Sequence, residues 1–300
     1  MTVSLSDAAG TFEIAGTRSH SEPALPMSLS RPVPRKMSAM LLPSDEAGRG
    51  RPVVLLHARP TDRTMWRAHL PLLAEAGVRA IALDLPGHGA ASLPEGREAA
   101  PWADVLDTLD HLGVDHFTLA GNSLGALVAL QVAVTAPERV EGLVLVGYRP
   151  HEQPASPRLQ AAWDAERAAL AAGDLEAAVT AGVRAWTSPD ATGDIREHAA
   201  RMLRDQLTGQ LAHGEPSPAA DPLGEGAAGT RTLKAPALVG VGEHDMPDFF
   251  EGGEKLARDL DAGEIVVIPG AGHLAPLEQP TAFCALLLNF VHRIPEPSRR

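Results

Sequence analysis

The sequence predicts an α/β fold built on a mostly parallel sheet of eight strands, with helices on both faces. Short runs of uninterrupted apolar residues, such as 53–57 and 142–147, alternate with longer segments whose apolar residues recur every three or four positions. The first pattern is typical of parallel strands buried on both faces, and the second of helices that cover a sheet. Glycine or proline stands near many of the junctions, as chain reversals require.

The first two expected strands are the least regular. These two strands are expected to form a hairpin at one edge of the sheet, joined by a loop rich in serine and proline. The structure of the rest of residues 1–50 is left open. The pattern then becomes regular: segment 65–77 places Trp66, Leu70 and Leu73 at helical spacing and stops at a glycine. The eight expected strands are 11–16, 36–42, 53–57, 78–84, 117–121, 142–147, 237–242 and 264–270.

The alternation of strands and helices stops after the sixth strand. Residues 156–213 hold three helical patterns rich in alanine and no strand pattern, and a connector rich in proline and glycine follows at 215–229. Strand and helix patterns then resume. We therefore expect a helical cap of residues 148–230, inserted after the sixth strand into a core domain formed by residues 1–147 and 231–300.

Composition narrows the class of function. The chain has 26 basic and 38 acidic residues, a formal net charge of −12. This balance argues against binding nucleic acid or an anionic membrane, because both need clustered positive charge. A single cysteine, Cys284, cannot form an intramolecular disulfide, and its apolar neighbours indicate a core residue. With neither a signal peptide pattern nor a membrane-length apolar run, the expected location is the cytoplasm.

The stretch LAGNSLGALVAL, residues 119–130, joins a strand end to an apolar helical run. Ser123 stands between Gly121 and Gly125 at this junction. Such a turn is tight and strained, and glycines on either side remove side chains that would collide with neighbouring backbone. The turn would raise the hydroxyl above the sheet beside a helix N-terminus, which favours negative charge. Ser123 is therefore a candidate nucleophile.

A serine nucleophile needs a base, and the base needs a group that orients it. His273 follows the last expected strand, at an edge where functional side chains gather in parallel sheets. The strand at 237–242 leads into three carboxylates at the same edge, those of Glu243, Asp245 and Asp248. The order serine, acid, histidine is the one expected for this type of sheet.

Taken together, these segments resemble the α/β-hydrolase fold superfamily, over about residues 52–292. Ser123, Asp245 and His273 match its nucleophile, acid and base, and Glu243 falls on the position before the acid. The resemblance also implies an oxyanion hole formed by the backbone N–H groups of Leu124 and Arg59. Five motifs carry it, in this order: HARP (57–60), DLPGHG (84–89), GNSLG (121–125), GEHD (242–245) and GAGH (270–273).

The sequence departs from the family pattern at two places. Ala58 follows His57 where members usually have glycine, so the oxyanion loop forms only if this turn avoids positive φ. The neighbouring Arg59 either holds a substrate carboxylate or forms a salt bridge. Asn122 resembles hydrolases that cleave carbon–carbon bonds of ring-fission products, but those usually have tryptophan after the histidine, where Leu274 stands here.

The expected function is that of a serine hydrolase acting on a carboxylic ester or lactone of a small, mainly apolar substrate. A carbon–carbon hydrolase of vinylogous diketones and a ligand-binding protein on the same scaffold are the alternatives. No cofactor and no metal ion is expected, because no residues have metal-ligand spacing or form a phosphate-binding loop. The only expected partner is the small-molecule substrate, and the oligomeric state stays open.

Overall fold

The computed structural model describes residues 40–92, 96–214 and 217–294. Seven strands form one sheet in the order β1-β3-β2-β4-β5-β6-β7. Every neighbouring pair is parallel except β1 with β3, which is antiparallel. The strands are β1 (Ser44–Ala47), β2 (Arg51–Leu56), β3 (Val78–Leu83), β4 (Phe117–Asn122), β5 (Val140–Val146), β6 (Ala237–Gly242) and β7 (Val266–Ile268).

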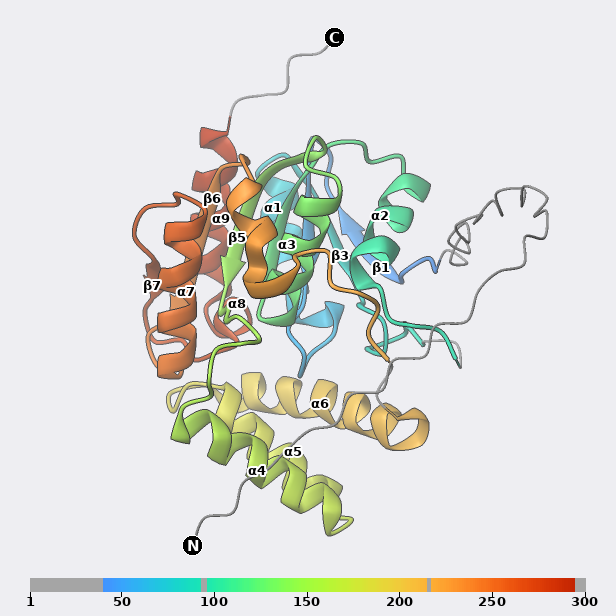
Figure 1. The fold of residues 1–300 in the computed structure, drawn as a ribbon, viewed down its shortest axis with the longest axis vertical. Coiled ribbons are helices and arrows are strands. Elements are labelled where there is room, and N and C mark those ends of the chain that lie inside the picture. Colours follow the sequence, from blue (N-terminus) through green and yellow to red (C-terminus); the bar gives the residue numbers. More distant parts are fainter. Residues whose placement is uncertain (1–39, 93–95, 215–216, 295–300) are drawn as a thin grey trace, which may run out of the picture. The chain divides into compact units, whose positions relative to one another are not determined.

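Helices cover both faces of the sheet (Figure 1). Successive side chains of β2 enter two different apolar clusters: Val53 and Leu55 pack with the cluster of α1 and α9, and Val54 and Leu56 with that of α2 and α3. A strand buried on both faces has no polar side, which explains its uninterrupted apolar run. The helices are α1 (His69–Glu75), α2 (Pro101–His111), α3 (Leu124–Thr135), α7 (Pro247–Asp259), α8 (Ala275–Glu278) and α9 (Pro280–Arg293).

Three helices lie between β5 and β6 in the chain, and we call them the helical insertion: α4 (Pro157–Ala171), α5 (Leu175–Trp186) and α6 (Gly193–His213). They form a separate layer at the lower end of the molecule in Figure 1. Each begins at a side chain that accepts a backbone N–H of its first turn, namely Ser156, Asp174 and Thr192. A hydrogen bond of 2.9 Å between His198 of α6 and Thr64 joins the insertion to the core.

The expected number of eight strands is wrong for the part of the chain that the structure describes, which has seven. The expected strand 11–16 lies outside the described residues. In the expected strand 36–42, residues 40–42 are not strand, because the Leu42 N–H bonds to Thr108 Oγ1 of α2 and Pro43 has no N–H. The edge strand begins only at Ser44. Five described strands precede the insertion, because the expected strand 11–16 lies outside the described residues.

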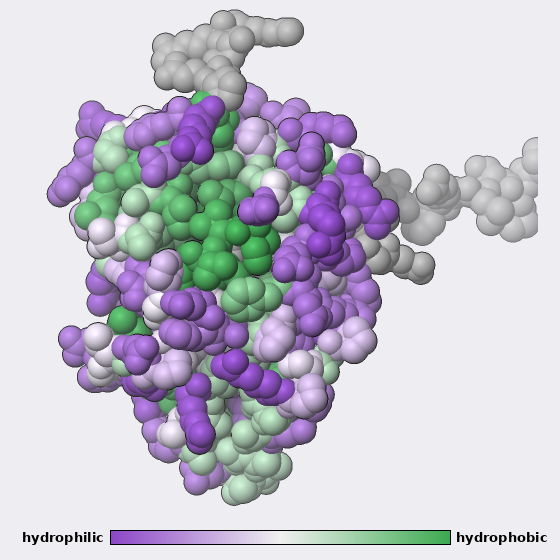
Figure 2. Space-filling model, turned by 90° about the vertical axis from the view of Figure 1, so that its left-hand side faces the viewer, coloured by the Kyte–Doolittle hydropathy of each residue, from purple (hydrophilic) through white to green (hydrophobic). Residues whose placement is uncertain are grey.

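The opposite edge of the sheet is β7, which is only three residues long. Figure 2 shows apolar side chains gathered on the face of the molecule formed by α7, β7 and α9. Val267 of β7 is 45% exposed there. So short an edge strand offers few backbone groups for pairing with another chain.

Two further expectations concern single features. Cys284 is buried in the core, where burial raises the pKa of its thiol to about 11, so it stays protonated at neutral pH. No helix in the described part of the chain is long and apolar enough to cross a membrane.

His69 makes the stability of the fold sensitive to acid. It is fully buried at the start of α1, with its ring 5.0 Å from that of Trp66 and 5.6 Å from that of Phe283. Burial lowers the pKa of His69 from 6.5 to about 4. Between these two values the unfolded chain binds a proton that the native protein does not, so stability is present above pH 6.5 and is lost as pH falls towards 4.

From pH 7 to pH 5, His69 should therefore remove about 2 kcal/mol of unfolding free energy. The variant His69→Phe should lose that much less stability over the same interval. Urea denaturation at both pH values measures the difference, with the exposed His111→Gln as control. An equal acid-induced loss in His69→Phe and in the unmodified protein would contradict the assignment.

Candidate active site

Ser123 occupies the turn between β4 and α3. Its backbone has φ 55° and ψ −110°, a left-handed conformation that costs energy for any residue except glycine. In the described residues, Asp261 is the only other non-glycine with positive φ. The Ser123 N–H donates to the Val146 carbonyl of β5 at 2.8 Å, which holds the turn against the neighbouring strand. The strained turn expected from the sequence is confirmed.

The two glycines around Ser123 are required by close approach of the backbone. A Cβ at Gly121 would lie 2.3 Å from the carbonyl carbon and oxygen of Gly125. A Cβ at Gly125 would lie 2.0 Å from the Leu56 carbonyl oxygen at the end of β2. Both distances are far shorter than any real contact of a methyl group. The pattern Gly-x-Ser-x-Gly is therefore explained by packing of the turn against its own helix and against β2.

His273 and Asp245 form a buried pair. His273 Nδ1 lies 2.9 Å from Asp245 Oδ2, and both side chains are almost inaccessible to solvent. Asp245 Oδ1 accepts the Met246 N–H at 2.7 Å, which fixes the carboxylate. The loops after β6 and β7 position these residues, as the sequence predicts.

The other two carboxylates at this edge have different partners. Glu243 is exposed and accepts the Gly270 N–H at 2.8 Å. Asp248 accepts the backbone N–H and the hydroxyl of Ser156, at 2.7 and 2.5 Å, and so anchors the start of the helical insertion. Among the three candidates, the geometry therefore selects Asp245 as the partner of the histidine.

The serine turn and the histidine meet at the end of β5. The Asn122 side-chain amide donates to the carbonyls of His273, at 3.1 Å, and of Val146, at 3.2 Å. A Cβ at Gly147 would lie 3.1 Å from both the Asn122 amide nitrogen and His273 Cε1. Asn122 thus ties the residue before Ser123 to the histidine loop. No hydrogen bond joins the Ser123 hydroxyl to His273 within the described residues, and such bonds often tighten only with substrate.

Two aromatic rings confine the imidazole, and the sequence did not identify either as part of the site. The Phe249 ring of α7 lies 4.0 Å from the His273 ring, and the Trp186 ring at the end of α5 lies 5.1 Å away. Although Trp186 belongs to the helical insertion, its ring lies against the histidine loop. The sequence held one weak indication that Phe249 belongs to the site, because it follows Asp245 by four residues at the start of a helix.

The expected oxyanion donors lie at two chain segments. Leu124 is the first residue of α3, so its N–H is one of the donors that a helix N-terminus leaves unpaired. Arg59 follows Ala58 in the loop after β2. Ala58 does not have positive φ, so alanine replaces the usual glycine here without backbone strain.

The Arg59 side chain forms an ion pair with Glu166 of α4, with 3.4 Å between Nη1 and Oε1. Glu166 is buried and Arg59 is half-exposed. Of the two interpretations left open by the sequence, the salt bridge is the one observed. It links the loop that carries a candidate oxyanion donor to the helical insertion.

His57 is a structural residue. Its ring is fully buried, with Nε2 accepting the Leu85 N–H at 2.9 Å and Nδ1 lying 2.8 Å from the Ala58 carbonyl. Burial lowers the pKa of His57 well below its ordinary value, and the ring stays neutral. Both ring nitrogens are therefore occupied by the backbone, as expected for a buried histidine at a strand end.

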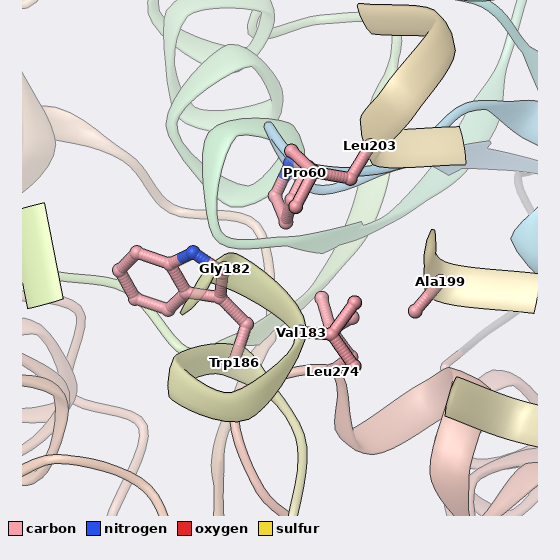
Figure 3. Close-up of a pocket in the computed structure, with 7 residues that line it drawn as sticks. All are labelled: Pro60, Gly182, Val183, Trp186, Ala199, Leu203 and Leu274. Carbon is pink, nitrogen blue, oxygen red and sulfur yellow. The ribbon is translucent and has the colours of Figure 1, made fainter. Parts of the chain in front are cut away.

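A narrow apolar pocket lies between the helical insertion and the core (Figure 3). It has no room for a water molecule in this structure, and its lining contains no charged side chain. It borders both the oxyanion loop, through Pro60, and the histidine loop, through Leu274. The lining residues are Pro60, Gly182, Val183, Trp186, Ala199, Leu203 and Leu274. Across the described ranges, no three His, Cys, Asp or Glu residues are grouped so as to hold a metal ion.

Comparison with known proteins agrees with this geometry. The chain is 31% identical over 260 residues to the dihydrolipoyllysine-residue acetyltransferase component of the acetoin cleaving system of Pseudomonas putida; the alignment covers 81% of this chain but only 64% of that protein. It is 28% identical over 260 residues to the 2-hydroxymuconate semialdehyde hydrolase of Pseudomonas sp. (strain CF600), covering 82% and 88% of the two chains.

Among solved structures, a thermophilic esterase from Thermogutta terrifontis superposes with a TM-score of 0.67 at 28% identity, over 84% of this chain and 93% of the esterase. The model of the alpha/beta hydrolase family matches residues 53–286, from within β2 into α9. The chain therefore belongs to the alpha/beta hydrolase family.

Proposed function

We propose that this protein is a serine hydrolase that cleaves a carboxylic ester or lactone of a small, mainly apolar substrate through an acyl-enzyme. The observation that carries the proposal is the buried His273–Asp245 pair, 2.9 Å apart, beside the strained turn that presents Ser123. A binding protein on this scaffold would need none of these three residues in this relation. Their arrangement matches a nucleophile, a base and an orienting acid.

In the proposed mechanism, His273 takes the Ser123 proton as the hydroxyl oxygen attacks the carbonyl carbon. The N–H groups of Leu124 and Arg59 hold the oxyanion of the tetrahedral intermediate. His273 then gives the proton to the leaving alkoxide, and the acyl-enzyme forms. Water activated by the same imidazole hydrolyses it and frees Ser123. Asp245 holds the imidazole tautomer and stabilises its protonated form.

The surroundings favour a small, uncharged substrate. The side chains that line the gap beside Leu274 are apolar and would contact an alkyl or acyl group more favourably than a charged one. The cation nearest the oxyanion loop, Arg59, is already paired with Glu166. A substrate carboxylate at that place would have to compete with a buried partner, so a neutral ester or lactone fits better.

A carbon–carbon hydrolase is the second candidate. It is favoured by Asn122 and by the 28% identity to a 2-hydroxymuconate semialdehyde hydrolase. The Asn122 side chain, however, bonds to two backbone carbonyls and acts as a tie between loops. A coloured ring-fission product separates the two candidates, because its colour fades only when the carbon–carbon bond is cleaved.

The test is a rapid-mixing burst assay with p-nitrophenyl acetate and butyrate. We expect about one equivalent of nitrophenol per active site, followed by slower turnover, because acylation precedes hydrolysis of the acyl-enzyme. A p-nitrophenyl ester of a long fatty acid should react poorly, since the gap beside Leu274 leaves no room for a long acyl chain. Absence of release from the short esters, in a protein that fades the ring-fission product, would overturn the proposal in favour of the second candidate.

A further inference from the structure

Glu278, the last residue of α8, is buried and joins two distant segments. Its Oε1 accepts the Gly272 N–H at 3.1 Å, and its Oε2 accepts the Ser188 N–H at 2.7 Å. Gly272 immediately precedes His273. Ser188 follows α5 and belongs to the segment that leaves this helix of the insertion. One carboxylate therefore bridges the histidine loop and the insertion.

The same two segments are also in direct contact. The Leu274 N–H donates to the Trp186 carbonyl at 3.2 Å. A Cβ at Gly272 would lie 2.5 Å from the Ser188 nitrogen, so only glycine allows this approach. The residues before and after His273 are thus both hydrogen-bonded to segment 186–188, one through Glu278 and the other directly. The imidazole therefore cannot shift without displacing segment 186–188 as well.

Keeping a carboxylate at this buried position is costly. Burial raises the pKa of Glu278 above its ordinary value, against the effect of the two backbone N–H bonds and of nearby His273. The like charge of Asp245 also disfavours ionisation of Glu278. A neutral side chain would avoid this cost, but it lacks the two equivalent oxygens that here accept one backbone N–H each. The carboxylate is therefore suited to a role that neutral side chains cannot fill.

We propose that Glu278 is a positioning residue that couples the seating of segment 186–188 to the alignment of His273 towards Ser123. The inference rests on the proposed function, in which His273 is the base. It follows that the insertion must be docked on the core for His273 to act as the base. The histidine loop is held on both sides only when Ser188 is bonded to Glu278.

Three variants test this proposal. Glu278→Gln keeps the shape but can accept only one of the two N–H groups at its single oxygen, and it removes the charge beside His273. Glu278→Asp keeps the charge but is one methylene shorter, so it cannot span both donors. Glu243→Gln is the matched control, because Glu243 also accepts a loop N–H, that of Gly270, but is exposed.

We expect kcat for p-nitrophenyl acetate to fall about 10- to 100-fold in both Glu278 variants, with a much smaller change in KM, because the lost geometry matters most in the transition state. The acid limb of the kcat/KM profile should move to lower pH in Glu278→Gln, which loses a negative charge beside the imidazole, and stay in place in Glu278→Asp. Glu243→Gln should change none of these. Wild-type kcat and pH profile in both Glu278 variants, with only a lower melting temperature, would overturn the proposal.

A measurement independent of turnover separates this inference from the proposed function. The ring N–H of His273 that faces Asp245 gives its own signal in ¹H–¹⁵N spectra of histidine-labelled protein. Faster exchange of this proton with water in both Glu278 variants, and not in Glu243→Gln, supports the positioning role even if no ester is cleaved. Unchanged exchange in both Glu278 variants overturns it, whereas a missing burst in the unmodified protein would overturn only the serine hydrolase assignment.

Discussion

Replacing Ser123 by alanine should lower kcat for p-nitrophenyl acetate about a million-fold and abolish the burst, while the protein stays folded. The change removes only the hydroxyl oxygen that would attack the carbonyl. The backbone bond from the Ser123 N–H to Val146 does not involve the side chain, and alanine bears the left-handed φ of this turn at a cost similar to that of serine. The melting temperature should therefore stay close to that of the unmodified protein.

The matching control is the exposed Ser92→Ala, which should retain full activity. Mass spectrometry after brief exposure to the acetate ester should detect one acetyl group on the unmodified protein and none on Ser123→Ala. Ordinary turnover in the folded Ser123→Ala variant would refute the role of Ser123 and direct attention to another nucleophile.

The sheet order explains why the sequence could predict that the candidate site residues lie at one edge of the sheet. Strands β4, β5, β6 and β7 are successive neighbours in the sheet. Side chains that follow β4, β6 and β7 must then meet at one edge, because the carboxyl ends of parallel strands lie together. Ser123, Asp245 and His273 each stand just after such a strand. The positions of their motifs in the chain were therefore enough to predict that the three residues lie close together.

The features that the sequence did not predict depend on how the helical insertion lies on the core. Trp186 meets His273, and Glu278 meets Ser188, through contacts between segments that are far apart in the chain, and no local pattern reports such contacts. The sequence left open whether Arg59 holds a substrate carboxylate or forms a salt bridge, because its partner Glu166 is 107 positions away in the chain. The edge strand was expected too early in the chain, because Thr108 occupies the Leu42 N–H that a strand partner would have used and the strand begins at Ser44.

Asp245→Asn should lower kcat about ten-thousand-fold with little loss of stability, because it leaves the imidazole in the wrong tautomer. In the native site, Oδ1 accepts the Met246 N–H at 2.7 Å and Oδ2 faces His273 Nδ1 at 2.9 Å. An asparagine would keep its carbonyl oxygen on Met246 and turn its NH₂ group to the histidine. Nδ1 must then accept a hydrogen bond, so the ring proton moves to Nε2, which can no longer take the Ser123 proton.

Glu243→Gln is the control for this variant too, because it makes the same chemical change two residues earlier on an exposed side chain, and its activity should stay near that of the unmodified protein. Pre-steady-state assays should show that acylation, and not only hydrolysis of the acyl-enzyme, becomes slow in Asp245→Asn. The effect of combining this variant with Ser123→Ala should be no larger than that of Ser123→Ala alone, since the three residues act as a unit. If Asp245→Asn kept within about tenfold of normal kcat, the imidazole would not need its carboxylate and the base would have to be sought elsewhere.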